Sequence, residues 1–139
     1  MTESRYPAVA ALELRLALGT MFIAHALLKY FVFTLPGTAE FFVSLGLPGA
    51  LGYATFAAEL VGGVLLILGV QTRAVALALV PILLGATWAH AGNGWVFSAP
   101  NGGWEYPAFW TVTLVVQALL GDGAYALRPS HPQAAAHPA

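Results

Sequence analysis

The sequence predicts an all-α integral membrane protein, a four-helix bundle of transmembrane helices. Of its 139 residues, 59% are hydrophobic and 8% are charged, whereas about 25% of the residues of a soluble domain carry charge. A chain this poor in charge cannot cover a surface that faces water, but it can cover one that faces lipid. The apolar residues also fall into four long runs, separated by segments rich in Gly and Pro. These observations indicate a single transmembrane domain over residues 1–128.

The four spans are predicted from the length of each apolar run, because a helix needs about 20 residues to cross the hydrocarbon core. The first is expected at about residues 8–33. Its apolar run is longer than the roughly 7–15 residues of a signal peptide, so we expect it to be retained. The second, third and fourth are expected at about 49–70, 73–91 and 106–120.

The segments between the spans predict the orientation of the chain. Residues 34–48 and 92–104 are expected as ordered loops and contain no Lys or Arg, and 129–139, rich in Pro, Ala and His, are expected as a disordered tail. Three basic residues lie at the opposite ends of the spans: Arg5, Arg73 and Arg128. Since positive residues favour the cytoplasmic side, both termini are predicted to be cytoplasmic and the two loops to lie outside.

Charge and cysteine content narrow the classes of function. The net charge of -1 disfavours a nucleic-acid partner, which would require a basic surface. The chain has no cysteine, which excludes disulfides, thiolate nucleophiles, iron–sulfur clusters and zinc ribbons. The lipid bilayer is the partner that composition predicts.

Ionisable residues inside the first span indicate a face that avoids lipid. A charged residue at the centre of a span costs at least about 2.5–3.5 kcal/mol on insertion scales, so each calls for a partner or a function. Arg15, His25 and Lys29 are the ionisable members of one stripe, which also contains Leu18 and Phe22 and has spacings of three and four residues. This spacing marks one helix face, which should point into the bundle. At its inner end, Arg15 is expected to meet Gln117 of the fourth span.

The other spans bring polar residues to the depth of His25 and Lys29. Glu59 shares its face with glycines that let another helix approach closely, and we expect it to pair with Lys29. His90 ends the third span, and Glu105 begins the fourth, where a negative charge interacts favourably with the helix dipole. The sequence thus predicts a polar pocket in the outer half of the membrane, built by His25, Lys29, Glu59, His90 and Glu105.

A short internal repeat links two of the spans. Ala24-His25-Ala26 near the outer end of the first resembles Ala89-His90-Ala91 at the outer end of the third. Two hairpins of the same polarity would form a parallel repeat about the membrane normal.

The ordered set of these residues resembles the DoxX family of small four-helix membrane proteins. The matching residues run from position 15 to about 127: Arg15 with Gly19, His25 with Lys29, the run Leu45 to Pro48, Glu59 with Gly62 and Gly63, Leu68 and Gly69 with Arg73, His90, the run Glu105 to Pro107, and Gly121 with Gly123 and Tyr125. Ala26 and Arg128 depart from the pattern, where Gly and an acid are expected. The resemblance implies a bundle in the cytoplasmic (inner) membrane of a bacterium and a membrane subunit of a quinone-linked oxidoreductase.

A quinone site would give the residues of the predicted pocket four chemical roles. His25 or His90 would hydrogen-bond a quinone oxygen, while Glu59 would relay a proton. Lys29 would stabilise the developing negative charge, and Tyr53 or Trp88 would stack on the ring. Electrons would come from a redox partner protein or a bound haem. Haem held by His25 and His90 is the weaker alternative, and no metal is expected because the Glu-x-x-His pairs of di-iron bundles are absent.

Other functions remain open on the same residues. A non-enzymatic scaffold would use the buried charges to hold helices together or to respond to pH through its histidines. A small-solute or proton carrier would require a homo-oligomer. Whether the chain is an enzyme by itself is left open by the sequence.

Overall fold

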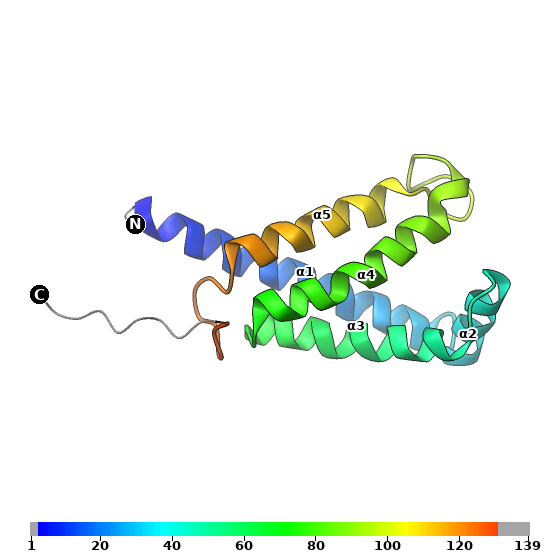
Figure 1. The fold of residues 1–139 in the computed structure, drawn as a ribbon, viewed down its shortest axis with the longest axis horizontal. Coiled ribbons are helices and arrows are strands. Elements are labelled where there is room, and N and C mark those ends of the chain that lie inside the picture. The colour runs from blue at the N-terminus through cyan, green and yellow to red at the C-terminus, as the bar shows by residue number, and fades with distance from the viewer. Residues whose placement is uncertain (1–2, 131–139) are drawn as a thin grey trace, which may run out of the picture.

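The computed structural model describes residues 3–130, which form five α-helices and two short 3-10 turns. In chain order they are the turn Glu3–Arg5, α1 (Tyr6–Phe31), α2 (Leu35–Ser44), α3 (Ala50–Leu68), α4 (Thr72–His90), the turn Ala91–Asn93 and α5 (Glu105–Leu120). The four predicted spans correspond to α1, α3, α4 and α5, and every helix end lies within two residues of the prediction. Figure 1 shows their arrangement.

Three of these helices are long and apolar enough to cross a membrane. They are α1 with its preceding turn (Glu3–Phe31), α3 (Ala50–Leu68) and α4 with its following turn (Thr72–Asn93). Helix α5 has 16 residues, which is about 24 Å of helix against a hydrocarbon core of about 30 Å. Length and composition therefore mark three candidate spans in the described part of the chain.

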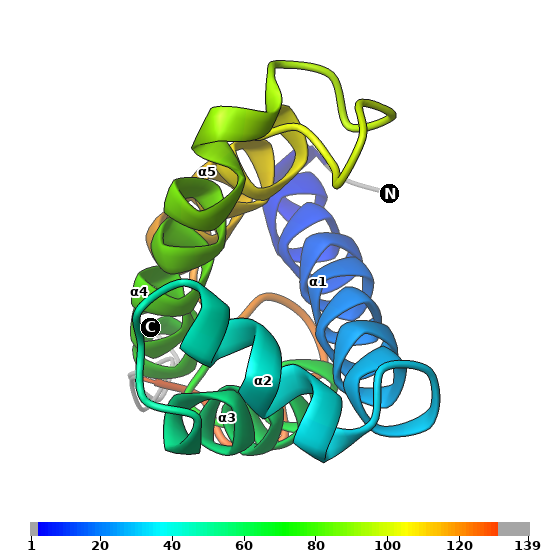
Figure 2. The ribbon, with the colours of Figure 1, turned by 90° about the vertical axis from the view of Figure 1, so that its right-hand side faces the viewer.

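Helix α2 replaces most of the loop expected over residues 34–48, and that expectation is wrong. The hydroxyl of Thr34 accepts a hydrogen bond from the N–H of Gly37 at 3.1 Å, which caps the helix start. Pro36 lies in the first turn, where a missing N–H costs nothing. The Leu-Pro-Gly run thus begins a helix instead of making a turn. Helix α2 lies across the end of α3 (Figure 2).

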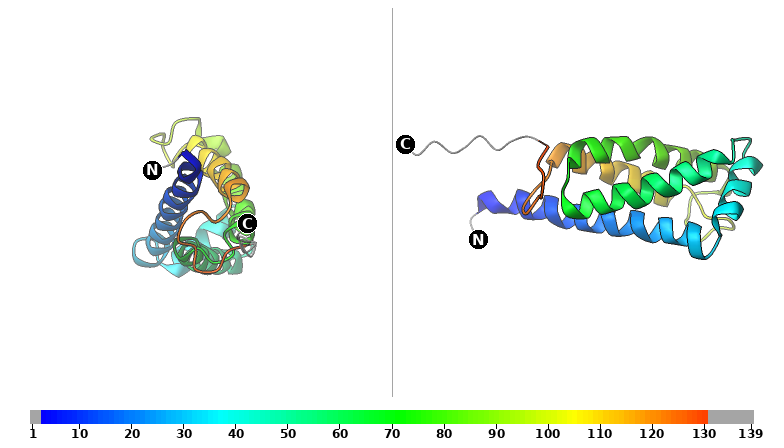
Figure 3. Two further views of the ribbon diagram at one scale, coloured as in Figure 1. Left: turned by 90° about the vertical axis from the view of Figure 1, so that its left-hand side faces the viewer. Right: turned by 90° about the horizontal axis from the view of Figure 1, so that it is seen from below.

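The long helices pack as two pairs, α1 with α3 and α4 with α5. Gly19 and Gly63 bring α1 and α3 together, because a Cβ at Gly63 would lie 2.8 Å from the carbonyl oxygen of Gly19. The side chain of Leu79 on α4 packs against Gly62, where a Cβ would lie 2.9 Å from its methyl carbons. Glycines on the Glu59 face therefore make the interhelical contacts that the sequence predicts. The pairs diverge towards the end that carries α2 and residues 91–104, called here the loop end (Figures 1 and 3).

An apolar core lies between the two pairs. Its buried members come from all four long helices: Leu18, Phe22, Leu66, Ala76, Leu79, Leu83, Trp110, Leu114 and Ala118. Arg15 and Gln117 lie on the side of this core towards the start of α1, and the predicted pocket residues lie towards the loop end. The core thus separates two polar regions.

Residues 121–130 fold back across the opposite end of the bundle, called here the terminal end (Figure 3). The N–H of Ala124 donates a hydrogen bond to the carbonyl of Ala8 at 2.9 Å, and the N–H of Arg128 donates one to the carbonyl of Gly69 at 3.0 Å. The segment, termed the strap, therefore ties the start of α1 to the α3–α4 turn. The tail predicted over 129–139 begins inside the strap, and residues 131–139 lie outside the described part of the chain.

Arg15 and Gln117 are both buried at the terminal end, but they do not hydrogen-bond each other as expected. Arg15 Nη2 donates to the carbonyl of Ala124 at 3.0 Å. Gln117 Nε2 donates to the carbonyls of Ala11 at 3.1 Å and Gly121 at 2.9 Å. The carbonyls of Gly121 and Ala124 follow the end of α5 and lack intrahelical partners, so they are free to accept these bonds, and Gln117 also bonds to the carbonyl of Ala11 inside α1.

Candidate functional site

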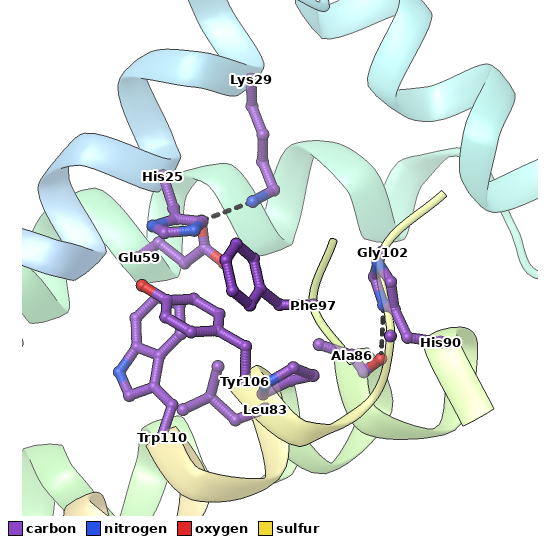
Figure 4. Close-up of a pocket in the computed structure, with 12 residues that line it drawn as sticks. His25, Lys29, Glu59, Leu83, Ala86, His90, Phe97, Gly102, Tyr106 and Trp110 are labelled. Carbon is purple, nitrogen blue, oxygen red and sulfur yellow. Dashed lines mark hydrogen bonds and ion pairs between the residues drawn. The ribbon is translucent and has the colours of Figure 1, made fainter. Parts of the chain in front are cut away.

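A pocket of about 500 Å³ lies at the loop end between the two helix pairs. One wall is polar and comes from α1 and α3; the other is aromatic and comes from α5 and the segment before it (Figure 4). The lining residues are His25, Lys29, Glu59, Leu83, Ala86, His90, Phe97, Gly102, Gly103, Tyr106, Pro107 and Trp110.

Helix α1 supplies the polar wall because its stripe faces inward. Arg15, Leu18 and Phe22 are buried, while His25 and Lys29 are half-buried at the pocket. A spacing of three and four residues keeps side chains on one helix face over several turns. The packing of α1 against α3 and α5 then turns that face towards the pocket.

Lys29 and Glu59 form an ion pair between α1 and α3. Lys29 Nζ lies 2.7 Å from Glu59 Oε2, and the two side chains are 18% and 5% exposed. A charged pair this far from water is held in place by its partner, because either charge alone would carry a large desolvation penalty. Within residues 3–130, Glu59 Oε1 makes no hydrogen bond. This oxygen is therefore open to a further donor.

His25 and His90 share one local geometry. His25 Nδ1 lies 2.9 Å from the carbonyl oxygen of Met21, and His90 Nδ1 lies 2.8 Å from that of Ala86. A carbonyl oxygen only accepts hydrogen bonds, so each Nδ1 carries the proton. The second ring nitrogen, Nε2, is consequently the one left to contact a ligand. The three-residue repeat in the sequence thus has a structural counterpart.

The two histidines nevertheless lie on opposite sides of Phe97 (Figure 4). His25 packs against the rings of Trp110, with centroids 4.7 Å apart, and Tyr106, at 6.1 Å. His90 lies beside Gly102, where a Cβ would come within 3.4 Å of its ring. Because Phe97 lies between them, a haem held by both histidines would require this side chain to move aside.

Three residues predicted for the site lie outside this pocket. Glu105 lines a smaller neighbouring pocket with Trp95, Tyr106 and Phe109. Tyr53 and Trp88 have exposed side chains. Trp88 precedes His90 by two residues, a separation that places side chains on nearly opposite helix faces. Depth in the membrane alone cannot distinguish these faces, which is why the prediction included them.

The residues that form the polar wall lie within the part of the chain that matches a known family. The model of the DoxX family matches residues 10–92, from α1 to the end of α4. The chain belongs to the DoxX family. This DoxX protein is 40% identical over 78 residues to a protein of Bacillus subtilis (strain 168) named "Putative oxidoreductase CatD". The matched stretch covers 56% of this chain and 57% of the relative, so it spans little more than half of either. No solved structure matches the chain.

The aromatic wall of the DoxX pocket is the part that sequence reasoning missed. Tyr106 and Trp110 are four residues apart on α5 and therefore share a face. Their spacing was the available signal, but both residues also suit an aromatic belt at the membrane surface. Trp110 is instead buried against Phe22, with ring centroids 4.6 Å apart.

The acidic and histidine side chains of the pocket do not form a metal centre. Within residues 3–130, no three His, Cys, Asp or Glu residues are grouped closely enough to hold a metal ion. The pocket instead offers one ion pair, two histidine nitrogens and a set of aromatic faces. Such a site suits a small planar organic molecule with polar atoms at its edge.

Proposed function

We propose that this DoxX protein is the membrane subunit of a quinone-linked oxidoreductase and that its pocket binds the quinone head group. The observation that supports this proposal is that one pocket is lined by His25 with its Nε2 nitrogen, by the Lys29–Glu59 ion pair and by the rings of Tyr106 and Trp110. Its volume of about 500 Å³ is within the roughly 300–1,000 Å³ of small-molecule sites. The name of the Bacillus subtilis relative supports redox chemistry.

His25 would hold and donate a proton at the quinone edge. When bound, a quinone supplies an acceptor for two electrons and two protons. Protonated His25 would donate from Nε2 to a carbonyl oxygen and release that proton as the oxygen gains charge. Its Nδ1–H would remain on the Met21 carbonyl throughout. The ring therefore keeps its orientation in both protonation states.

The ion pair would serve the same reaction from α3. Glu59 Oε1 would receive a proton and pass it to His25, which lies beside the carboxylate in Figure 4. Lys29 would stabilise negative charge on the reduced oxygen. Tyr106 and Trp110 would offer ring faces for stacking. Because the chain contains no cysteine for an iron–sulfur cluster, we assign electron delivery to a partner protein.

Helix α5 would be the fourth crossing of a bundle in the inner membrane of a bacterium. It runs beside α4 for its whole length (Figure 1), so it returns the chain from the loop end to the terminal end. The basic residues Arg5, Arg73 and Arg128 favour a cytoplasmic position for the terminal end.

Quinone binding is the direct test of this function. The purified protein should release a quinone on organic extraction and should bind added decylubiquinone. His25→Ala should weaken binding about tenfold or more, the effect of losing a hydrogen bond from a charged donor. Trp88→Leu, which changes an exposed aromatic residue outside the pocket, should leave affinity unchanged. An empty extract with no binding of decylubiquinone would contradict the proposal.

A non-enzymatic scaffold is the second candidate, favoured by the ion pair itself. The Lys29–Glu59 contact joins α1 to α3, so its purpose could be to hold these helices together. Glu59→Gln separates the two functions. A proton relay predicts that turnover with the partner is lost while the protein remains folded. Both functions predict a lower unfolding temperature, because Lys29 loses its counter-ion. The partner's chemistry therefore decides between them, and a scaffold predicts that it is unchanged.

A further inference from the structure

Phe97 covers the pocket without being packed in place. Its side chain is 65% exposed, yet it lines the pocket and lies between His25 and His90 (Figure 4). A side chain with so much exposed surface gains little from burial. Its position must therefore come from the backbone of residues 94–104, which connects α4 to α5.

The carboxylate of Glu105 fixes that backbone. Glu105 Oε1 accepts a hydrogen bond from the N–H of Phe97 at 3.1 Å. The N–H of Glu105 in turn donates to the carbonyl of Trp95, also at 3.1 Å. Glu105, the first residue of α5, is thus hydrogen-bonded to both neighbours of Val96, Trp95 and Phe97. Hydrogen bonds to a carboxylate are stronger than those between neutral groups.

The other limb of the segment is held by Asn93 and by packing against the limb that carries Phe97. Asn93 Nδ2 donates to the carbonyl oxygens of Asn101 at 3.2 Å and Gly102 at 3.0 Å. Gly103 packs so closely that a Cβ there would collide with the carbonyls of Trp95 and Val96. The base of the segment is further joined by the hydrogen bond from the N–H of Trp104 to the carbonyl of Gly94, at 3.1 Å, and by the rings of Trp95 and Trp104, with centroids 4.5 Å apart. Beyond this base, the side-chain hydrogen bond that reaches Phe97 within residues 3–130 is the one to Glu105.

We propose that Glu105 is a positioning residue that latches Phe97 over the pocket, so that residues 94–104 form a gate for the pocket's ligand. The part of the segment around Phe97 is exposed and has one side-chain hydrogen bond, so it opens at a lower free-energy cost than a helix-lined wall. On the opposite side the pocket meets the apolar core, including buried Leu83 and Trp110. Only the nature of the ligand rests on the proposed function; the latch itself does not.

A spin label on the gate tests the latch without any ligand. Because the chain has no cysteine, Ser98→Cys provides one labelling site beside Phe97, and electron paramagnetic resonance reports its mobility. Glu105→Ala should make the label clearly more mobile. Glu105→Gln retains an oxygen acceptor and should resemble the parent. Glu40→Ala, which removes an exposed acid from α2, is the matched control and should change nothing.

Two outcomes of the spin-label experiment would overturn the latch. One is a label equally immobile in Glu105→Ala and in the parent. The other is a label as mobile in Glu105→Gln as in Glu105→Ala, because the hydrogen bond to Phe97 would then not be what holds the segment.

Ligand exchange provides the second measurement. Decylubiquinone should dissociate about tenfold faster from Glu105→Ala than from the parent, as expected from one lost hydrogen bond to a charged group. An unchanged rate would overturn the gate. If the parent binds no quinone while the label responds, the quinone proposal fails and the latch stands. If quinone binds and the label does not respond, the latch fails and the quinone proposal stands.

Discussion

Arg15 and Gly69 illustrate how one residue can depend on the absence of a side chain in another. Gly69 ends α3 with a φ of 72°, in the left-handed region where residues other than Gly are disfavoured. A Cβ at this position would collide with the Arg15 guanidinium and lie 2.7 Å from Cα of Ala126 in the strap. The buried arginine and the strap therefore both need glycine here.

Replacing Gly69 with Ala should destabilise the protein. The left-handed backbone alone costs about 1–2 kcal/mol for a residue with a Cβ, and the collision with Arg15 adds to it. Thermal unfolding in detergent should show a clearly lower midpoint for Gly69→Ala. Gly85→Ala is the matched control, because a Cβ there meets nothing within 4 Å and lies within α4. Equal midpoints for the two variants would contradict this account.

The residue scale also shows which part of the site was predictable. The pairing of Lys29 with Glu59 follows from sequence because two opposite charges at one depth in a membrane have few other partners. Whether Tyr53 and Trp88 line the pocket could not be predicted in this way, because depth in the membrane does not determine the direction in which a side chain points. Trp110 shows the reverse: its burial against Phe22 and His25 depends on how α5 rotates in the bundle.

At the scale of elements, the strap closes the terminal end through Asp122. Its carboxylate accepts hydrogen bonds from the N–H of Thr72 at 3.3 Å, the N–H of Ser130 at 2.9 Å and the hydroxyl of Ser130 at 3.0 Å. Thr72 begins α4, so the negative charge also lies at a helix N-terminus. Burial by itself would raise the pKa of Asp122, but these hydrogen bonds lower it below its ordinary value of 3.8.

This lowered pKa predicts how stability depends on pH. Because the pKa is lower in the folded state, Asp122 stabilises the protein above its ordinary pKa of 3.8, and the contribution disappears as pH falls through the folded-state value. Asp122→Asn should lower the unfolding midpoint at about pH 6, with the difference from the parent shrinking towards about pH 3. A difference that stays constant over this range would contradict the assignment.

Helix α2 marks a limit of reading elements from local sequence. Leu35-Pro36-Gly37 has the composition of a turn, and the same Pro is acceptable in the first turn of a helix. The hydrogen bond from Gly37 to Thr34 decides for the helix. Packing of α2 against α3 also stabilises the helix. The two helices approach closely at Gly52, where a Cβ would lie 3.2 Å from the backbone of Ala39.

At the scale of the whole molecule, α2 and residues 91–104 lie at one end of the two helix pairs and the strap lies at the other (Figures 1 and 3). The pocket is at the loop end, where residues 97, 102 and 103 line it. Residue 98 lies at the loop end before α5, and residue 125 lies at the terminal end after it. The position of these two residues relative to the membrane therefore depends on whether α5 crosses.

Labelling with a membrane-impermeant maleimide tests that crossing and the orientation together. With a cytoplasmic terminal end, Ser98→Cys should react in cells whose inner membrane is intact and accessible. Tyr125→Cys, at an exposed side chain of the strap, should react only after that membrane is permeabilised. The reverse pattern would contradict the orientation, and reaction of both from one side would contradict a crossing by α5.

The four long helices could be predicted from the lengths of the apolar runs, and the inward stripe of α1 from the spacing of its charged residues. The sequence also determined that Glu59 needs a cationic partner, since a charge in a span must be compensated. Two features could be seen only in the folded protein: Phe97, Tyr106 and Trp110 line the pocket, and Glu105 accepts a hydrogen bond from the N–H of Phe97. Those outcomes depend on the rotation of α5 and the path of residues 94–104, which arise from contacts between distant parts of the chain.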